Sequence, residues 1–240
     1  MKRRTYLITG ATKGIGRATA EWLAAGGHGV VGIARQGDDP DFPGTLVSAD
    51  LGDRDQADAV FKDLAGRFEF DGLVNNVGMI KPQALGEIDL DTFDATHALH
   101  LHPAIQASQA LLPGMKARGW GRIVNVSSLT IFGLPGRTAY GSAKAAMVNF
   151  TRTWALELAR TGITVNAIAP GPIETELFRA NNPKGSDGEA AYLAMVPMDR
   201  LGDPREIAAT LAFMLGEDSG YMTGQTICVD GGASVGRAAF

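Results

Sequence analysis

Short apolar runs, rich in β-branched residues, alternate with longer amphipathic stretches along almost the whole chain. The runs expected to form strands are residues 6–9, 29–34, 45–49, 73–74, 122–126, 163–168 and 226–229. The stretches expected to form helices are residues 15–25, 53–68, 104–115, 138–159 and 204–215. Continuously apolar strands separated by helices are typical of a parallel sheet covered on both faces. The alternation therefore predicts an α/β fold with a doubly wound parallel sheet.

A single domain over residues 1–240 is expected, because neither a linker nor an internal repeat interrupts the alternation. The one long irregular stretch is residues 181–188, which is polar and contains proline and glycine. Such a stretch inside a compact domain is either a lid over a site or a disordered insert. We favour the lid.

Composition narrows the classes of partner. The chain is 45% hydrophobic and carries a net charge of −4, whereas a nucleic-acid or anionic-membrane surface calls for a basic field. The start of the chain has no apolar stretch long enough for a signal-peptide core or a membrane span. The single cysteine, Cys228, cannot form an internal disulfide. We expect a cytoplasmic protein with no metal site.

The first predicted strand runs into the sequence TGATKGIG, residues 9–16, directly before a predicted helix. Glycines at such a turn let backbone amides approach a pyrophosphate, and the helix N-terminus faces the phosphates with unpaired N–H groups. The spacing is GxxxGxG rather than the GxGxxG of the general dinucleotide fingerprint. A purely structural tight turn is the alternative explanation.

Residues at the end of the second predicted strand would lie beside the adenosine ribose of such a cofactor. An acidic residue about 20 positions past the glycines would bind the 2′-hydroxyl of NAD, but here Ala34 is followed by Arg35. A guanidinium pairs well with the 2′-phosphate of NADP, and Lys13 adds a second positive charge. The alternative is that both are solvated surface cations. NADP(H) is therefore favoured, with NAD(H) still possible.

Tyr140 and Lys144 are four positions apart in a predicted helix, so both project from one face. A phenol with a pKa of about 10 needs about 4 kcal/mol to act as a base near pH 7. An ammonium about 4 Å away, at an effective dielectric near 20, supplies about that amount. A YxxxK pair also arises by chance on surface helices, so the pair alone is not decisive.

Polar or turn-forming groups follow three other predicted strands. They are NNVG at residues 75–78, Ser127 with Ser128, and Pro170 with Gly171. Ligands bind at the carboxyl ends of strands in open α/β sheets. The set TGxxxGxG, NNxG, serine, YxxxK and PG, in this order, resembles the short-chain dehydrogenase/reductase family over essentially the whole chain. The resemblance implies a Rossmann-type fold and an NAD(P)(H)-dependent oxidoreductase similar to the 3-oxoacyl-[acyl-carrier-protein] reductases.

The resemblance also implies roles for individual residues. The residues expected to bind the cofactor are Gly10, Thr12, Lys13, Gly14, Ile15, Gly16, Arg35, Asp50, Leu51, Asn76, Gly78, Tyr140, Lys144, Pro170, Gly171, Ile173 and Thr175. Tyr140 would be the general acid or base, while Lys144 would hold the nicotinamide ribose and lower the pKa of the tyrosine. Residues 174–198 match the variable substrate lid.

The chain departs from the family pattern at three places. Val77 replaces the usual alanine, which should matter little because family contacts there are mainly to backbone. The catalytic serine is Ser127 by its distance from the tyrosine and Ser128 by its place at the strand end; we favour Ser128. His100 stands where the family has an asparagine that holds a relay water. Imidazole both donates and accepts hydrogen bonds and titrates near neutrality, so His100 is either a relay member or a bystander.

The expected reaction is hydride transfer between nicotinamide and a ketone or secondary alcohol. The substrate is either a 3-oxoacyl thioester or a cyclic or sugar-derived alcohol. A non-catalytic NADP-binding regulator on the same fold is the alternative, although such proteins commonly lose the tyrosine or lysine that are present here. Family habit suggests a homotetramer or homodimer.

Overall fold

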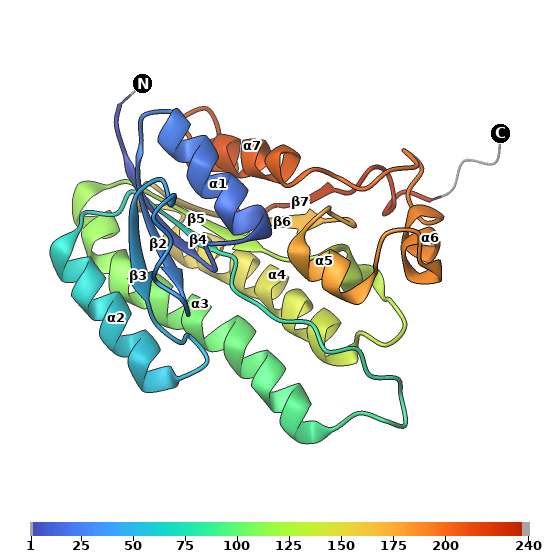
Figure 1. The fold of residues 1–240 in the computed structure, drawn as a ribbon. Coiled ribbons are helices and arrows are strands. Elements are labelled where there is room, and N and C mark those ends of the chain that lie inside the picture. The colour runs from blue at the N-terminus through green and yellow to red at the C-terminus, as the bar shows by residue number, and fades with distance from the viewer. Residues whose placement is uncertain (1, 237–240) are drawn as a thin grey trace.

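The computed structural model describes residues 2–236, and within them seven strands form one parallel sheet in the order β3-β2-β1-β4-β5-β6-β7 (Figure 1). The strands are β1 (Thr5–Thr9), β2 (Gly29–Ala34), β3 (Thr45–Ser48), β4 (Gly72–Asn75), β5 (Gly121–Val126), β6 (Ile163–Pro170) and β7 (Thr226–Val229). The chain winds outward in one direction from β1 and in the other from β4. Ligands bind where such a strand order reverses. The predicted parallel sheet is confirmed.

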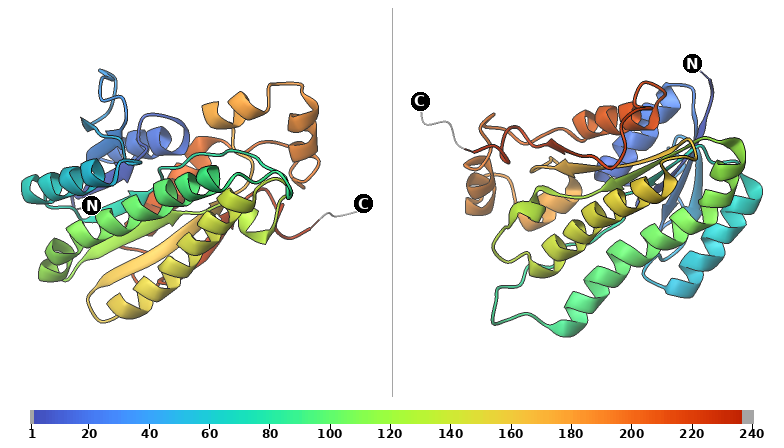
Figure 2. Two further views of the ribbon diagram at one scale, coloured as in Figure 1. Left: turned by 90° about the horizontal axis from the view of Figure 1, so that it is seen from below. Right: turned by 180° about the vertical axis from the view of Figure 1, so that it is seen from behind.

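Helices cover both faces of this sheet. The long helices are α1 (Gly14–Ala25), α2 (Arg54–Arg67), α3 (Leu90–Arg118), α4 (Thr138–Leu158) and α7 (Pro204–Leu215). Helices α1 and α7 pack together on one face, and α2, α3 and α4 pack side by side on the other (Figures 1 and 2). Strand β1 serves both cores, because Tyr6 and Ile8 point into one cluster while Leu7 points into the other. This confirms the doubly wound architecture.

Buried polar side chains fix the helix that carries the predicted catalytic pair. Asn75 of β4 donates to Asn125 of β5 over 2.8 Å, and Asn125 donates to Thr151 of α4 over 2.9 Å. All three residues are buried. Buried hydrogen bonds of this kind specify a unique packing, so α4 is held in register with the strand ends.

Two segments differ from the sequence-based expectation. Helix α3 begins at Leu90, well before residue 104, because Asp89 caps its first turn and Pro103 is accommodated inside the helix. Residues 181–188 are largely framed by two short helices, α5 (Glu176–Asn181) and α6 (Asp187–Leu193). Thr175 and Ser186 cap these helices. None of the helices in the described part of the chain is both long and apolar enough to cross a membrane.

Candidate active site

A cavity of about 1280 Å³ lies at the carboxyl ends of the strands. That volume exceeds the roughly 300–1,000 Å³ of an ordinary small-molecule site, so the cavity has room for a dinucleotide and a second ligand. Of the residues predicted for the cofactor and for catalysis, all but Gly16 line it. They are Gly10, Thr12, Lys13, Gly14, Ile15, Arg35, Asp50, Leu51, Asn76, Gly78, His100, Ser128, Tyr140, Lys144, Pro170, Gly171, Ile173 and Thr175.

The glycine loop is shaped by close backbone approaches. Gly10 and Gly14 adopt positive φ angles of 66° and 52°, a region that favours glycine. Gly16 lies in the first turn of α1, where a Cβ atom would be 2.1 Å from the carbonyl oxygen of Gly10. Gly16 therefore lets the helix pack against its own loop, which explains why it does not line the cavity.

One backbone amide of the loop already binds an anionic group. Lys13 precedes α1 without a side-chain cap, and the Gly14 amide donates to the Glu176 carboxylate over 3.1 Å. That carboxylate, which comes from the lid, stands in for an anionic group at a helix N-terminus. The glycine cradle at this helix N-terminus therefore fits the pyrophosphate of a dinucleotide.

Asn76 ties the glycine loop to the end of β4. Its side-chain amide donates to the carbonyl oxygens of Thr9 and Gly10, both over 3.0 Å, while its backbone N–H donates to the Thr9 hydroxyl. Val77 lines the cavity and packs against the apolar core beneath it. The floor of the crevice is thus held mainly through backbone groups.

The two adjacent serines point to different partners. The Ser127 hydroxyl is buried and donates to the backbone carbonyl of Lys144 over 2.9 Å. The Ser128 hydroxyl accepts from the Thr130 amide over 3.2 Å and also interacts with the Tyr140 phenol. Of these two serines, the structure brings only Ser128 to the tyrosine.

Tyr140 and Lys144 both lie in α4 at the cavity wall. The Lys144 ammonium is buried, donates to the Val126 carbonyl over 2.7 Å and lies 5.6 Å from the centre of the tyrosine ring. Burial lowers the pKa of Lys144 to about 7. Burial also raises the pKa of Tyr140, against the opposing effects of the Ser128 hydrogen bond and the Arg137 charge. The net effect on the Tyr140 pKa is upward because burial disfavours the phenolate, and a lowering of that pKa by Lys144 stays a prediction.

His100 is buried at 2% exposure and packs edge-to-face on Tyr140, with ring centres 5.4 Å apart. Its Nε2 lies 3.1 Å from the Met79 nitrogen and 3.0 Å from the Met79 oxygen. Within residues 2–236, Nδ1 has no hydrogen-bond partner. Burial, followed by the charge of Lys144, lowers the pKa of His100 to about 3. His100 lies beside Tyr140, where a member of the proton relay is expected. The expectation that it titrates near neutrality is wrong, because the imidazole is buried away from water.

Two residues at the substrate side of the cavity carried no sequence signal. Arg137 immediately precedes α4, and its guanidinium donates to the Tyr192 hydroxyl of α6 over 3.0 Å. The two are far apart in the sequence, and no motif links them. Only the folded chain shows that they meet.

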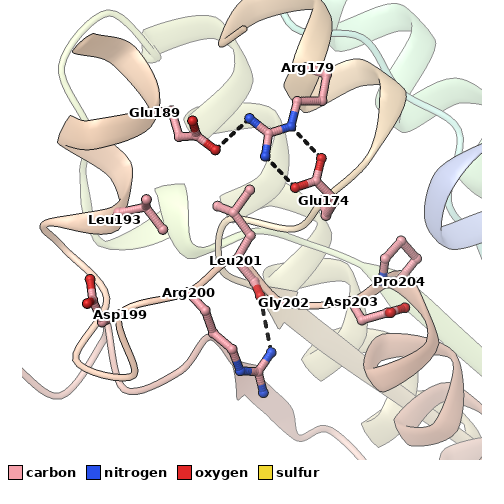
Figure 3. A pocket seen from close by; sticks show the side chains of 10 residues that line it. All are labelled: Glu174, Arg179, Glu189, Leu193, Asp199, Arg200, Leu201, Gly202, Asp203 and Pro204. Atoms are coloured by element: carbon pink, nitrogen blue, oxygen red, sulfur yellow. Dashed lines mark hydrogen bonds and ion pairs between the residues drawn. The ribbon is translucent and has the colours of Figure 1, made fainter. Parts of the chain in front are cut away.

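The short lid helices are connected by an ion-pair cluster, which we call the lid latch: Arg179, Glu174 and Glu189. Figure 3 shows the Arg179 guanidinium between the two carboxylates. Arg179 lies in α5 and Glu189 in α6, and their ion pair measures 2.6 Å. Arg179 also pairs with Glu174 through two of its nitrogens. The latch borders a separate, smaller cavity of about 640 Å³.

Comparison with known proteins places this site among relatives of similar length. A family model described as enoyl-(acyl carrier protein) reductase matches residues 10–234. The 3-oxoacyl-[acyl-carrier-protein] reductase FabG of Vibrio harveyi is 37% identical over 97% of this chain and 98% of its own. A solved structure from Beutenbergia cavernae, provisionally named an NAD(P)-dependent gluconate 5-dehydrogenase and containing NADP at low occupancy, aligns with a TM-score of 0.91. It is 33% identical, over 97% of each chain. YwfH, an NADPH-dependent reductase involved in bacilysin biosynthesis, aligns with a TM-score of 0.88 and 27% identity over 97% of this chain and 98% of its own.

Proposed function

Because the chain belongs to the short-chain dehydrogenase/reductase family and is an NAD(P)-dependent oxidoreductase, we propose that Tyr140 is the general acid or base of a ketone–alcohol interconversion. The observation that carries this assignment is the convergence of Tyr140, Ser128 and buried Lys144 on the cavity that also holds the glycine loop. In that arrangement the glycine loop would bind the cofactor, and Ser128, Tyr140 and Lys144 would bind and protonate the substrate oxygen.

The proton chemistry follows from the environment of each group. In the reductive direction the neutral Tyr140 phenol donates its proton to the substrate oxygen, and the Ser128 hydroxyl hydrogen-bonds that oxygen. The bound nicotinamide supplies the hydride. Lys144, whose pKa lies at about 7, exchanges a proton at neutral pH and would hold the ribose of the bound cofactor. We propose that His100 serves the relay as a neutral ring, with Nε2 on Met79 and Nδ1 facing a relay water.

NADP(H) is the cofactor we propose, with NAD(H) as the weaker alternative. Arg35 and Lys13 both line the cavity, and neither forms an ion pair with any residue in the described range 2–236. Two similar structures are described with NADP or NADPH. If Arg35 binds the 2′-phosphate, Arg35→Ala should raise the KM for NADPH at least about tenfold and leave NADH kinetics almost unchanged. A wild-type preference for NADH would contradict the assignment.

The experiment that tests the function is turnover of a ketone panel with NADPH and with NADH. The panel contains 3-oxoacyl thioesters, cyclic ketones and keto sugars, because the similar proteins include both a 3-oxoacyl reductase and a provisional gluconate dehydrogenase. Reduction of at least one class supports the proposal. Tight cofactor binding without turnover of any class would instead indicate a regulator.

We also propose that residues 174–198 form the substrate lid, because residues of α5 and α6 such as Phe178 and Tyr192 line the cavity and the latch connects the two helices behind them. A cytoplasmic homotetramer or homodimer is the assembly we propose. Small residues on α4 could let the helices of two subunits pack closely. Ser142 and Ala145 are exposed and available for such a contact, whereas Ala143 is already buried within its own chain. Light scattering coupled to size-exclusion chromatography measures the assembly directly.

A further inference from the structure

Arg137 places a positive charge at the substrate side of the cavity. Its side chain is half-buried, lines the cavity and lies three residues before Tyr140. Its one side-chain hydrogen bond within the described residues goes to the Tyr192 hydroxyl over 3.0 Å, and none of the ion pairs formed there involves it. A half-buried guanidinium with one neutral partner has donors left over for a ligand.

Tyr192 completes a pair of donors. Its oxygen accepts the Arg137 N–H, so its own proton remains available to an acceptor in the cavity. The ring packs edge-on against Phe178, with centres 5.3 Å apart, and α6 is fixed to α5 by the lid latch (Figure 3). The lid therefore holds this hydroxyl beside the guanidinium.

Negative charge is confined to the other end of the cavity. Asp50 and Glu176 are the acidic residues that line it. Asp50 accepts from the Gly52 amide over 2.9 Å, beyond the end of β3, and Glu176 accepts from Gly14 in the glycine loop. Both lie at the cofactor end. Among residues 2–236, no acidic residue lines the cavity beside Arg137, and the Arg137 charge already acts on Tyr140 by lowering its pKa.

We propose that Arg137 and Tyr192 bind a carboxylate of the substrate, so that the enzyme prefers ketones and alcohols that carry one close to the reacting carbon. This inference rests on the proposed oxidoreductase function. Arg137 directly precedes α4, three residues before Tyr140, and both side chains line the same cavity. The carboxylate would therefore lie near the substrate oxygen that Tyr140 protonates. One guanidinium and one neutral hydroxyl match a monoanion better than a phosphate dianion, which calls for more positive charge.

The test compares each of 3-, 4- and 5-oxohexanoate with its methyl ester, using NADPH, wild type and variants. In wild type, kcat/KM for at least one carboxylate should exceed that for its ester by about 10- to 100-fold, the worth of one charge-assisted hydrogen bond. In Arg137→Met this ratio should fall to near one, mainly through the KM for the carboxylate. Arg137→Lys should keep part of the preference because the charge remains, and Tyr192→Phe should reduce it a few-fold.

The outcomes separate this inference from the function on which it rests. If wild type reduces the esters at least as well as the carboxylates, or if Arg137→Met keeps the wild-type ratio, the carboxylate site is wrong while the oxidoreductase stands. If wild type reduces neither these ketones nor any ketone of the wider panel, the function fails, and the site with it. An unchanged melting temperature and NADPH affinity in Arg137→Met exclude misfolding as the cause of a lost preference.

Discussion

The cofactor end and the substrate end of the cavity are built from different kinds of contact. At the cofactor end, close glycine backbone and the Asn76 amide on two carbonyls position the site. At the substrate end, the position of Tyr192 depends on side-chain contacts between short helices, above all the lid latch. The cofactor end is therefore formed by the sheet and its loops, whereas the substrate end depends on α5 and α6, helices of only six and seven residues.

This difference has an energetic consequence. Buried hydrogen bonds to backbone are costly to leave unpaired, at about 1–3 kcal/mol each, whereas exposed ion pairs contribute about 0.2–1 kcal/mol. In the latch, the Glu174 side chain is 49% exposed and the Arg179 and Glu189 side chains are 24% and 12% exposed, so its ion pairs are partly exposed. We therefore expect substitutions to be tolerated poorly at the cofactor end and better in the lid. This difference suits a site that always binds the same cofactor but whose substrate varies between relatives.

The largest expected effect lies where the two ends meet. Tyr140→Phe removes the proton donor but keeps the ring that packs against His100. Because general acid–base catalysis is worth about 10²- to 10⁴-fold, kcat should fall by at least that range while the NADPH dissociation constant stays within about threefold of wild type. Steady-state kinetics and fluorescence titration measure the two quantities. Near-normal turnover would remove Tyr140 from the mechanism.

A methyl group at Gly16 tests the backbone-built end. In an ordinary helix, glycine to alanine stabilises by up to about 1 kcal/mol, but a Cβ here would lie 2.1 Å from the Gly10 carbonyl. Gly16→Ala should therefore weaken NADPH binding at least about tenfold and lower the free energy of unfolding by about 1–3 kcal/mol. Gly66→Ala in α2 is the matched control, because nothing lies within 4 Å of its Cβ position. Equal behaviour of the two variants would show that the loop adapts.

His100 connects both ends and should appear in the pH dependence of stability. Its pKa is about 3 in the folded protein against an ordinary 6.5, so the unfolded chain binds more protons between those values. The free energy of unfolding therefore falls as the pH drops through that window. Relative to His100→Asn, wild type should lose about 2 kcal/mol between pH 7.5 and pH 5.

Urea unfolding of both proteins at the two pH values measures this difference, and parallel losses would contradict a buried neutral ring. Because His100 stays neutral above its folded pKa of about 3, the pH–rate profiles of wild type and His100→Asn should coincide between pH 5 and pH 7. A wild-type limb in that range that the variant lacks would instead identify a titrating histidine relay.

The smallest expected effect concerns the lid latch. Arg179→Met should raise the KM for the ketone about two- to fivefold, the scale of partly exposed ion pairs, and leave NADPH affinity unchanged. Arg67→Met is the control, since Arg67 pairs with Asp63 on the surface of α2, away from the cavity. Steady-state kinetics with the ketone varied and with NADPH varied measure the two effects in both variants. A change in NADPH affinity larger than the change in ketone KM would contradict the separation of the two ends.

The cofactor end could be predicted from the sequence, whereas much of the substrate end could not. The strands, the glycine loop and the Tyr140–Lys144 pair are encoded by local patterns, and the structure places them together. The early start of α3 escaped prediction because Pro103 masks a helix that tertiary packing maintains. The low pKa of His100 depends on burial that no local pattern reveals. The contact between Arg137 and Tyr192 joins residues 55 positions apart, and the latch that supports it is formed by a lid without a motif.

We propose above all that this cavity transfers a hydride directly between nicotinamide and a carbonyl carbon. NADPH labelled with deuterium at the nicotinamide C4, prepared as each epimer separately, tests it with any ketone that the panel identifies. One epimer should deliver its deuterium to the carbinol carbon of the product and the other should not, and Tyr140→Phe should suppress the transfer. NADPH binding without deuterium transfer from either epimer, across the whole panel, would contradict it.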